Sequence, residues 1–482
     1  MNSIFWHIFL LISIQAGFST VLVNWNQAFR NLSQLGYFLA IIWALITLFA
    51  VLKYNCVLAN FTQRLTIITT RISKIHWIII CIITGIAVRI IWSLVFPPQF
   101  RSDYAEYFNL ARNLLEYGSY SHNHGYAYWP PGYPLFLYLH FLIFGVHSWV
   151  PLIANLWLFS LSIIVTFLLS RLVSLNNCVS YYSSIFLVFW PTYVASVTLP
   201  SKEMILVSLL PTSILLNILS TRIAVEKHSL LVTLLVIFFV GILSGVMSLA
   251  QPSMLLFLIV LLFYQWSYCK NLKSFFVKLI MMIIGTCLVI SPWDIRNYGV
   301  LNEFVLISTN GGDVFYRANN PIATGVYLRA GERDLEQFGE VERSKVGYRW
   351  GIEWILGNPV NFLKLALQKQ IFFLGDDGKG IYETLKRGLG ITDIRYFIFM
   401  GVSNLYYLIV WIFVLSSIWY HRKSNFPKAS EMVTFILTFL YLFLIHSIFE
   451  SGGKHHESLV VILAIFAALM GCENSSRSNS SV

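Results

Sequence analysis

Long apolar stretches recur along the chain and alternate with shorter polar ones, a pattern that predicts membrane-spanning helices. A span needs roughly 20 mainly apolar residues, because a helix rises about 1.5 Å per residue through a hydrocarbon layer about 30 Å thick. Roughly twelve stretches approach this length, and they lie near residues 4–22, 36–57, 77–96, 149–172, 178–197, 203–221, 229–250, 252–268, 276–292, 395–420, 430–449 and 457–471. The expected fold is therefore an all-α, polytopic membrane protein, since a helix satisfies its own backbone groups in lipid.

Composition supports this class. Hydrophobic residues make up 57% of the 482 positions and charged residues only 11%, too few charges for an ordinary soluble surface. The net charge of +11 favours anionic lipid headgroups. No clustered basic and aromatic pattern of a nucleic-acid module occurs, so nucleic acid is not an expected partner. The first apolar stretch lacks a basic leader and is expected to be a retained helix rather than a signal peptide.

Basic residues in the short loops predict the orientation, because Lys and Arg stay preferentially on the cytoplasmic side. In the twelve-span arrangement they fall on one face, at Arg64, Arg71, Lys74, Arg171, Arg222, Lys227, Lys270, Lys273, Lys278, Arg422, Lys423 and Lys428. Both termini are then cytoplasmic, and the active face is extracytoplasmic. The expected parts are an N-terminal hairpin and linker (1–70), a membrane core (71–292) with an external loop (97–148), an external domain (293–394), C-terminal membrane helices (395–471) and a disordered tail (472–482).

The first external loop begins with an acidic and aromatic segment. Apolar side chains recur every three or four residues between 103 and 117, which predicts a short amphipathic helix on the membrane surface that ends at Gly118. Asp103 and Glu106 lie three residues apart near its start and share one side. They fit a capping box that satisfies exposed backbone N–H groups. One of them also fits a general base that takes a proton from an attacking hydroxyl.

The same loop carries a resemblance to a known group of enzymes. Asp103-Tyr104, the following Tyr107 and the later Pro131-Gly132-Tyr133-Pro134 resemble the first external loop of GT-C superfamily membrane glycosyltransferases. These enzymes include relatives of protein O-mannosyltransferases and aminoarabinose transferases that use polyprenyl-phosphate sugars. The resemblance implies a GT-C-like bundle and a catalytic role for Asp103. Many members have an Asp-Glu pair here, whereas this chain has Tyr104 and then Glu106 as the next acid.

Two further acidic and basic positions extend the resemblance. Leu199-Pro-Ser-Lys-Glu203 is similar to the second acidic site of the group, and a carboxylate at the edge of an apolar helix usually faces a cavity or a partner. Pairing with Lys202 or with the helix N-terminus is the alternative for Glu203. Arg296 lies in the segment from Ser291 to Tyr298, which looks like the start of the external domain in bacterial members. Its guanidinium either meets a phosphate or anchors the interface.

The segment Glu450-Ser-Gly-Gly-Lys-His-His-Glu457 resembles an external motif in which family members carry Arg or His. Lys454 and His455 stand in its place, and a cation here offsets charge on a leaving phosphate. The sequence gives no certain cofactor. A divalent metal is possible but is not supported by the spacing, because adjacent helical side chains such as His455 and His456 point about 100° apart.

The resemblance implies sugar transfer, with inversion, from a polyprenyl-phosphate donor to an extracytoplasmic lipid, glycan or protein. The chain would lie in the cell membrane and have membrane lipids as further partners. Asp103, Glu203 and Glu106 are the candidate catalytic residues, while Lys454, His455 and Arg296 are the candidate phosphate ligands. The candidate substrate contacts are Tyr104, Tyr107, His122, His124 and Tyr133.

Two alternatives stay open at this stage. One is a flippase or transporter of a lipid-linked saccharide, and the other is a polysaccharide polymerase or ligase. A transporter is expected to carry paired broken helices or mid-membrane ionisable residues in related halves. No such internal repeat is visible, and the strongest polar signals lie at one membrane face.

Overall fold

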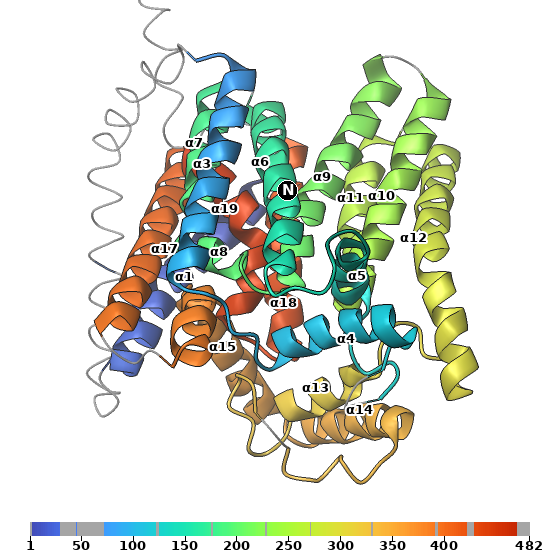
Figure 1. Cartoon of the computed structure of the whole chain (residues 1–482). Coiled ribbons are helices and arrows are strands. Elements are labelled where there is room, and N and C mark those ends of the chain that lie inside the picture. The colour runs from blue at the N-terminus through green and yellow to red at the C-terminus, as the bar shows by residue number, and fades with distance from the viewer. Residues whose placement is uncertain are drawn as a thin grey trace, which may run out of the picture.

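A computed structural model describes residues 2–28, 45, 72–121, 125–174, 177–226, 229–269, 271–328, 331–390, 394–421 and 429–469. The regular elements in this part of the chain are helical (Figure 1). They are α1 (Asn2–Ala28), α3 (Lys74–Val95), α4 (Asp103–Tyr117), α5 (Gly132–Phe144), α6 (Val150–Ser174), α7 (Asn177–Val188), α8 (Pro191–Ser196), α9 (Glu203–Glu226), α10 (Leu230–Ala250), η1 (Pro252–Phe257), α11 (Leu258–Tyr268), α12 (Leu272–Leu301), α13 (Asn310–Ala318), α14 (Glu340–Gly357), α15 (Pro359–Gly375), α16 (Lys379–Ile381), η2 (Tyr382–Gly388), α17 (Ile394–His421), α18 (Ala429–Ile448), η3 (Gly453–Leu459) and α19 (Val460–Leu469).

Seven of the described helices are long and apolar enough to cross a membrane, which confirms an all-α, multi-pass membrane protein. They correspond to α3, α6, α9, α10, α12, α17 and α18. Shorter apolar helices occur at His7–Thr20, Gly132–Phe144 and Pro252–Tyr268. The expected span at 36–57 lies outside the described residues, apart from Leu45, so the count of about twelve stays a prediction.

Two expected spans differ in the structure. The stretch 178–197 is divided into α7 and α8, because Pro191 lacks a backbone N–H and disfavours a helical conformation at the residue before it. The stretch 457–471 contains the short helix α19, about 15 Å long and too short to span alone. Every residue of α19 is buried. Its apolar sequence therefore reflects a protein core, since the neighbouring helices enclose it completely.

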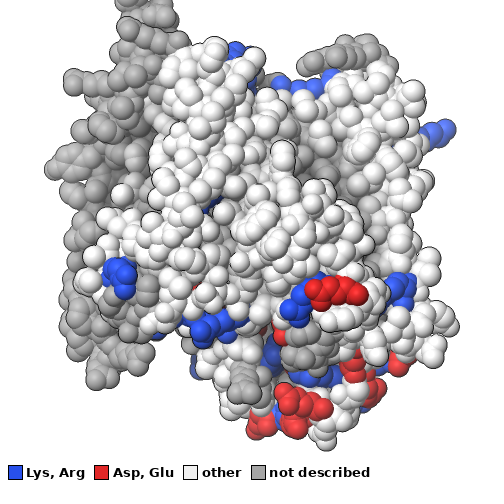
Figure 2. Space-filling model, in the orientation of Figure 1, with Lys and Arg blue, Asp and Glu red and all other residues white. Residues whose placement is uncertain are grey.

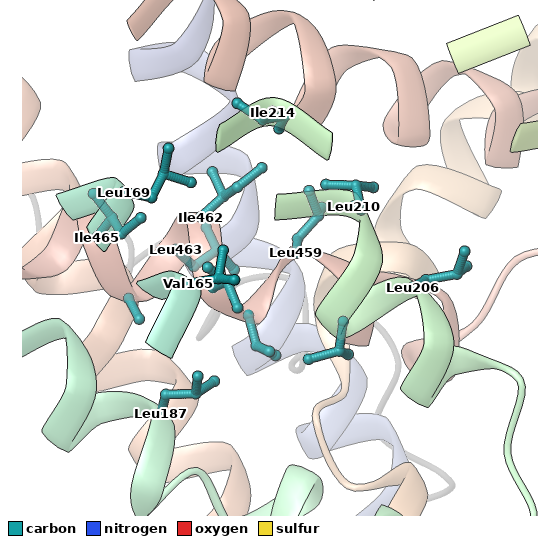
Figure 3. Close-up of a cluster of buried hydrophobic side chains, with 14 of the residues drawn as sticks. Val165, Leu169, Leu187, Leu206, Leu210, Ile214, Leu459, Ile462, Leu463 and Ile465 are labelled. Atoms are coloured by element: carbon teal, nitrogen blue, oxygen red, sulfur yellow. The ribbon is translucent and has the colours of Figure 1, made fainter. Parts of the chain in front are cut away.

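Helix α19 forms the centre of the hydrophobic core. It packs against α6, α7, α9 and α17. Figure 3 shows apolar side chains from these helices pointing at one another. The labelled members are Val165, Leu169, Leu187, Leu206, Leu210, Ile214, Leu459, Ile462, Leu463 and Ile465. This core fixes the far end of η3, which continues directly into α19.

Glycines bring α10 and α12 into close contact. Gly241 faces the backbone carbonyl of Met282, and Gly285 faces the backbone carbonyl of Phe238. A side chain at either glycine would collide with the opposite backbone, so small residues permit the approach. Helix α12 continues to Leu301, past the expected end of the membrane core at 292. The division into domains stays a prediction.

Polar elements gather at one end of the bundle, where α4, α13 and α14 are found (Figure 1). On the face shown in Figure 2, acidic side chains concentrate at this same end. Helix α4 occupies the expected residues, and Gly118 ends it in a left-handed conformation with φ of 64°. Tyr104, Tyr107, Leu110 and Ala111 form its buried face, as the apolar periodicity predicts.

The capping interpretation of the first turn of α4 is not observed. Ser102 is the N-cap residue, and Asp103 is the first residue inside the helix. The backbone N–H of Glu106 donates to the backbone carbonyl of Ser102 at 3.1 Å, which is an ordinary helical hydrogen bond. The Asp103 carboxylate is thus available for a contact outside its own helix.

Candidate active site

Asp103 and Lys454 form an ion pair between two distant parts of the chain. The ammonium Nζ of Lys454, in η3, lies 3.0 Å from Oδ2 of Asp103 at the start of α4. The hydroxyl of Ser102 donates to the other carboxylate oxygen at 3.2 Å. The side chains are 32% and 21% exposed for Asp103 and Lys454, so a bound substrate can reach both.

The ion pair controls the ionisation of Asp103. Burial acts to raise the pKa of this carboxyl, but the charge and hydrogen bond of Lys454 outweigh it and hold the pKa below its usual range. Burial acts in the opposite sense on Lys454, and attraction to Asp103 and Glu203 keeps the pKa of its ammonium well above the usual value. The pair is therefore fully ionised at neutral pH.

Glu203, the first residue of α9, is buried beside this pair. The hydroxyl of Ser201 donates to its Oε2 at 2.6 Å, while its Oε1 is buried without a hydrogen-bond partner. A buried carboxylate oxygen without a donor is costly, by roughly 1–3 kcal/mol or more for a charged group. Lys202 also faces this cluster, where burial lowers its pKa and the charges of Glu203 and Asp103 oppose that effect. Oε1 thus remains a buried acceptor without a hydrogen-bond donor.

Tyr104 contributes a phenol to the same cluster. The side chain is buried, and burial together with the carboxylates of Glu383 and Glu203 raises its pKa well above the usual value. It therefore keeps its proton and can donate it to an oxygen. Tyr107, one turn further along α4, is buried with its ring edge-on to Trp129 at 5.7 Å, so its contacts are those of a packing residue.

Tyr133 is connected to the turn before Glu203 through hydrogen bonds of Asn155. Its hydroxyl donates to Oδ1 of Asn155 at 3.0 Å. The Asn155 amide in turn donates to the carbonyls of Val197 and Leu199 at 2.9 and 2.7 Å. This chain of hydrogen bonds joins α5 and α6 to the turn that precedes Glu203, and it shapes the approach to α9.

The other two expected phosphate ligands are Arg296 and His455, and both contact protein groups other than Asp103. Arg296 donates to the carbonyls of Tyr126 and Tyr120 at 2.7 and 2.8 Å, so in this structure it anchors the first external loop. His455 stacks on His446 with ring centroids 4.2 Å apart. Burial, and then repulsion from His446 and Lys454, lowers the pKa of His455 well below its usual value. A neutral His455 offers a hydrogen bond but no positive charge.

The remaining expected residues are less informative. His122 and His124 lie outside the described residues. Glu106 lies in the first turn of α4, close in sequence to Asp103. Within the described ranges, no group of three or more His, Cys, Asp or Glu side chains is arranged to hold a metal ion.

Sequence reasoning missed a second group of charges, in the turn η2. Its buried Glu383 lies between two cations, with Lys379 Nζ at 2.6 Å and Arg387 Nη1 at 3.2 Å. This turn is π-helical, a rare conformation that is frequent at functional sites. The available signal was the charged run between Asp376 and Arg387, which interrupts two apolar stretches.

Glu457 is a second missed carboxyl. It is buried in η3, and the hydroxyl of Ser196 donates to its Oε1 at 2.7 Å. Burial and the neighbouring Glu203 and Asp377 raise its pKa well above the usual value. The site therefore contains carboxyl groups whose pKa values are shifted in opposite directions.

No protein-family model matches the sequence, and no curated protein matches it. Several solved structures have a similar arrangement of helices. The apo oligosaccharyltransferase of Archaeoglobus fulgidus aligns with a TM-score of 0.49 and 10% identity, over 82% of this chain and 50% of that chain. The same archaeal enzyme, AglB, in complex with an inhibitory peptide and a dolichol-phosphate, gives 0.48 and 10% over the same shares.

ArnT from Cupriavidus metallidurans bound to undecaprenyl phosphate aligns with a TM-score of 0.39 and 13% identity, over 80% of this chain and 78% of that chain. These TM-scores lie below 0.5 and the identities are 10–13%, so the alignments assign no activity to this chain. The chain spans about half the length of the archaeal enzyme. A functional conclusion for this chain depends on its own side chains, because likeness at this level describes helix arrangement alone.

Proposed function

We propose that this chain is an integral-membrane glycosyltransferase that moves a sugar from a polyprenyl-phosphate donor to a hydroxyl or amide acceptor. The observation that carries the proposal is the meeting of Asp103, Glu203 and Lys454, from three distant segments, at the polar end of a membrane bundle. A base, a hydrogen-bond acceptor and a cation in one cluster are the groups that such a transfer requires.

The chemistry follows from these groups. The Lys454 ammonium binds the donor phosphate and stabilises the negative charge that grows on it as the bond to the sugar breaks. Asp103 accepts the proton of the acceptor group while the acceptor oxygen or nitrogen bonds to the anomeric carbon. The phosphate leaves with the electron pair of the broken C–O bond, and this single displacement inverts the configuration. Glu203 Oε1 accepts a hydrogen bond from a sugar hydroxyl.

The ion pair orders these events. While Lys454 holds Asp103, the carboxylate is a weak base because its pKa is depressed. A donor phosphate that draws Lys454 away leaves burial as the main influence on Asp103, which raises the pKa. Asp103 therefore becomes an effective base when the donor is in place.

The site is proposed to face the extracytoplasmic side. The basic loops that predict the cytoplasmic face belong to the other ends of the spanning helices, for example Arg171 at the end of α6. The first external loop and helices α13 and α14 share the end that holds the site (Figure 1). A donor whose lipid tail lies between apolar helices would then present its sugar phosphate at this end.

The test uses purified protein in lipid nanodiscs with radiolabelled polyprenyl-phosphate sugars and a panel of acceptors. Asp103→Asn is expected to lower the rate of transfer at least about 100-fold, the usual contribution of a general base. Glu116→Gln is the matched control, since Glu116 lies on the same helix in a surface pair with Arg112. Undiminished transfer by Asp103→Asn would remove the base assignment, and saccharide translocation without transfer would overturn the enzyme in favour of a flippase.

A further inference from the structure

A second ion pair lies behind Lys454, fully enclosed by protein. Nε2 of His456, in η3, is 3.0 Å from Oδ1 of Asp377, which follows α15. Both side chains are at most 1% exposed, so no substrate can touch them. Neither residue belongs to the acid, base or phosphate-binding groups of the proposed reaction.

The hydrogen bonds around this pair determine its proton content. Nδ1 of His456 lies 2.5 Å from the carbonyl of Phe373, which can only accept, so Nδ1 carries a hydrogen. Nε2 faces a carboxylate, and that contact also needs a hydrogen between the two atoms. The pair thus holds one proton more than a neutral imidazole with a separate carboxylate.

The second carboxylate oxygen and the backbone N–H of Asp377 also have hydrogen-bond partners. The indole N–H of Trp190 donates to Oδ2 at 2.8 Å, and the Asp377 backbone N–H donates to Oδ1 of Asn404 at 3.0 Å. Burial raises the pKa of Asp377 to about 6, against the lowering effect of its bonds to His456 and Trp190. Every polar atom that surrounds the shared proton therefore has a fixed orientation.

Packing holds the imidazole in one plane. The His456 ring stacks on Tyr407, with centroids 4.8 Å apart and an interplanar angle of 7°. The ring edge of Phe373 meets it at 86°. Gly453 lies directly against the backbone carbonyl of Asp376, where a Cβ atom would collide. Lys454 lies between these two fixed points, Gly453 and His456, so the pair sets the position of its backbone.

We propose that His456 and Asp377 are positioning residues, whose shared proton holds η3 in the register that aims Lys454 at the donor phosphate. This inference rests on the proposed transferase function. Loss of that proton would leave a buried carboxylate opposite an imidazole lone pair, an unfavourable contact that releases η3.

The charged and titratable groups that surround the pair are known from each adjoining element. Asp376 lies beside Asp377 in the chain, and Glu457 follows His456 in η3. Tyr406 and Tyr407 face Asp377 from α17. Lys379 lies two residues after Asp377 and is paired with Glu383 at 2.6 Å, while His455 precedes His456 and has its pKa lowered by burial. His456 is therefore the basic side chain that contacts the Asp377 carboxylate.

Two variants of His456 separate positioning from general stability. His456→Asn places an amide near Nδ1 and keeps the bond to Phe373, but it does not reach Asp377. His456→Gln places an amide near Nε2 and keeps the contact with Asp377. We expect His456→Asn to raise the donor KM about ten- to hundredfold with an unchanged acceptor KM, since a small displacement of a binding group has effects of this size.

His456→Gln should restore the donor KM to within about threefold of the wild type, because its amide keeps the contact with Asp377. Gln265→Leu is the stability control. It breaks the buried network of Gln265, Asn217 and Lys278, which lies away from the site, and should lower the melting temperature without changing the donor KM.

The outcomes distinguish the two proposals. If the wild type transfers sugar and His456→Asn keeps its donor KM, or if Gln265→Leu raises the donor KM equally, the positioning role is wrong while the function stands. If the wild type transfers no sugar, the proposed function fails, and binding of polyprenyl phosphate is then measured directly by fluorescence. Equal binding by wild type and His456→Asn in that assay would also overturn the positioning role.

Discussion

Lys454 keeps Asp103 ionised against the effect of burial, so the properties of one side chain are set by the other. Glu383 is also a buried carboxylate paired with cations, since it lies between Lys379 and Arg387. Breaking a buried pair by removing one partner leaves an uncompensated charge, which is more damaging than removing both partners. A substitution of Lys454 therefore changes the protonation of Asp103 as well as its contacts.

Replacement of Lys454 by Met should move the acidic limb of the pH profile to higher pH. The limb of kcat/KM reports the free enzyme, in which Asp103 is paired. Without the cation, burial raises the Asp103 pKa, so the base becomes protonated at pH values where the wild type is still ionised. Transfer at pH 7 should also fall at least about tenfold because the phosphate loses its charge partner.

Lys454→Arg is the matched control, since it retains the positive charge. Its acidic limb should stay near that of the wild type even if its rate is lower. The pH dependence of kcat/KM between pH 4 and 8 gives the comparison. An unchanged limb in Lys454→Met would mean that Lys454 does not govern the ionisation of Asp103.

At the scale of the helix, glycine spacing determines how closely two spans approach. Gly285→Ala should destabilise the α10–α12 interface by about 1–3 kcal/mol, because the new methyl group meets the Phe238 carbonyl. Gly401→Ala, in the spanning helix α17, has no atom within 4 Å of the new methyl and should be neutral or slightly stabilising. Melting temperatures in detergent compare the two, and an equal loss in both would contradict the close-packing account.

A single carboxylate ties the first external loop to α14. Glu340 accepts hydrogen bonds from the backbone N–H groups of Tyr126 and Ala127, both at 2.7 Å. Glu340→Gln should weaken these bonds by about 1–2 kcal/mol, since charge-assisted bonds exceed neutral ones. Hydrogen exchange at these two amides should become about tenfold faster. Glu342→Gln, an exposed acid in the same helical turn, should leave the exchange unchanged.

Element boundaries show what the sequence can predict. The helix at 103–117 was predicted to the residue, because its apolar periodicity and Gly118 are local signals. The burial of α19 inside the protein was not predicted, because hydropathy does not distinguish a helix surrounded by lipid from one surrounded by protein. The break at Pro191 had a local signal, which the apolar run on both sides concealed.

The candidate site was predictable only in part, for a related reason. Asp103 and Lys454 were each proposed from motifs, and the structure brings them together. The Asp377–His456 pair joins residues 79 positions apart and has no periodic pattern that would connect them. Sequence patterns reveal neighbours within one element, whereas contacts between elements depend on the packing of the whole bundle.

At the scale of the whole molecule, Lys369 connects the external helices to the membrane bundle. Its buried ammonium donates to Oδ1 of Asn319, at the end of α13, at 3.0 Å and to the carbonyl of Ile448, at the end of α18, at 2.9 Å. Burial lowers the pKa of Lys369 to about 7, against a smaller opposing effect of Glu450. The connection between the two parts is therefore sensitive to pH.

The stability of the wild type should rise with pH between about 7 and 10.5, the folded and ordinary values of the Lys369 pKa. Within this window the unfolded chain binds a proton that the folded protein does not, so the slope is positive and at most about 1.4 kcal/mol per pH unit. Lys369→Met should remove the slope. Lys364→Met, at an exposed position on the same helix, should retain it in melting curves across this range.

The ion pair between Asp103 and Lys454 spans 351 positions of the chain. During synthesis the ribosome completes the first external loop long before it reaches η3. A nascent chain therefore holds Asp103 without its counter-ion until η3 has been made, so this ion pair forms only late in the assembly of the bundle.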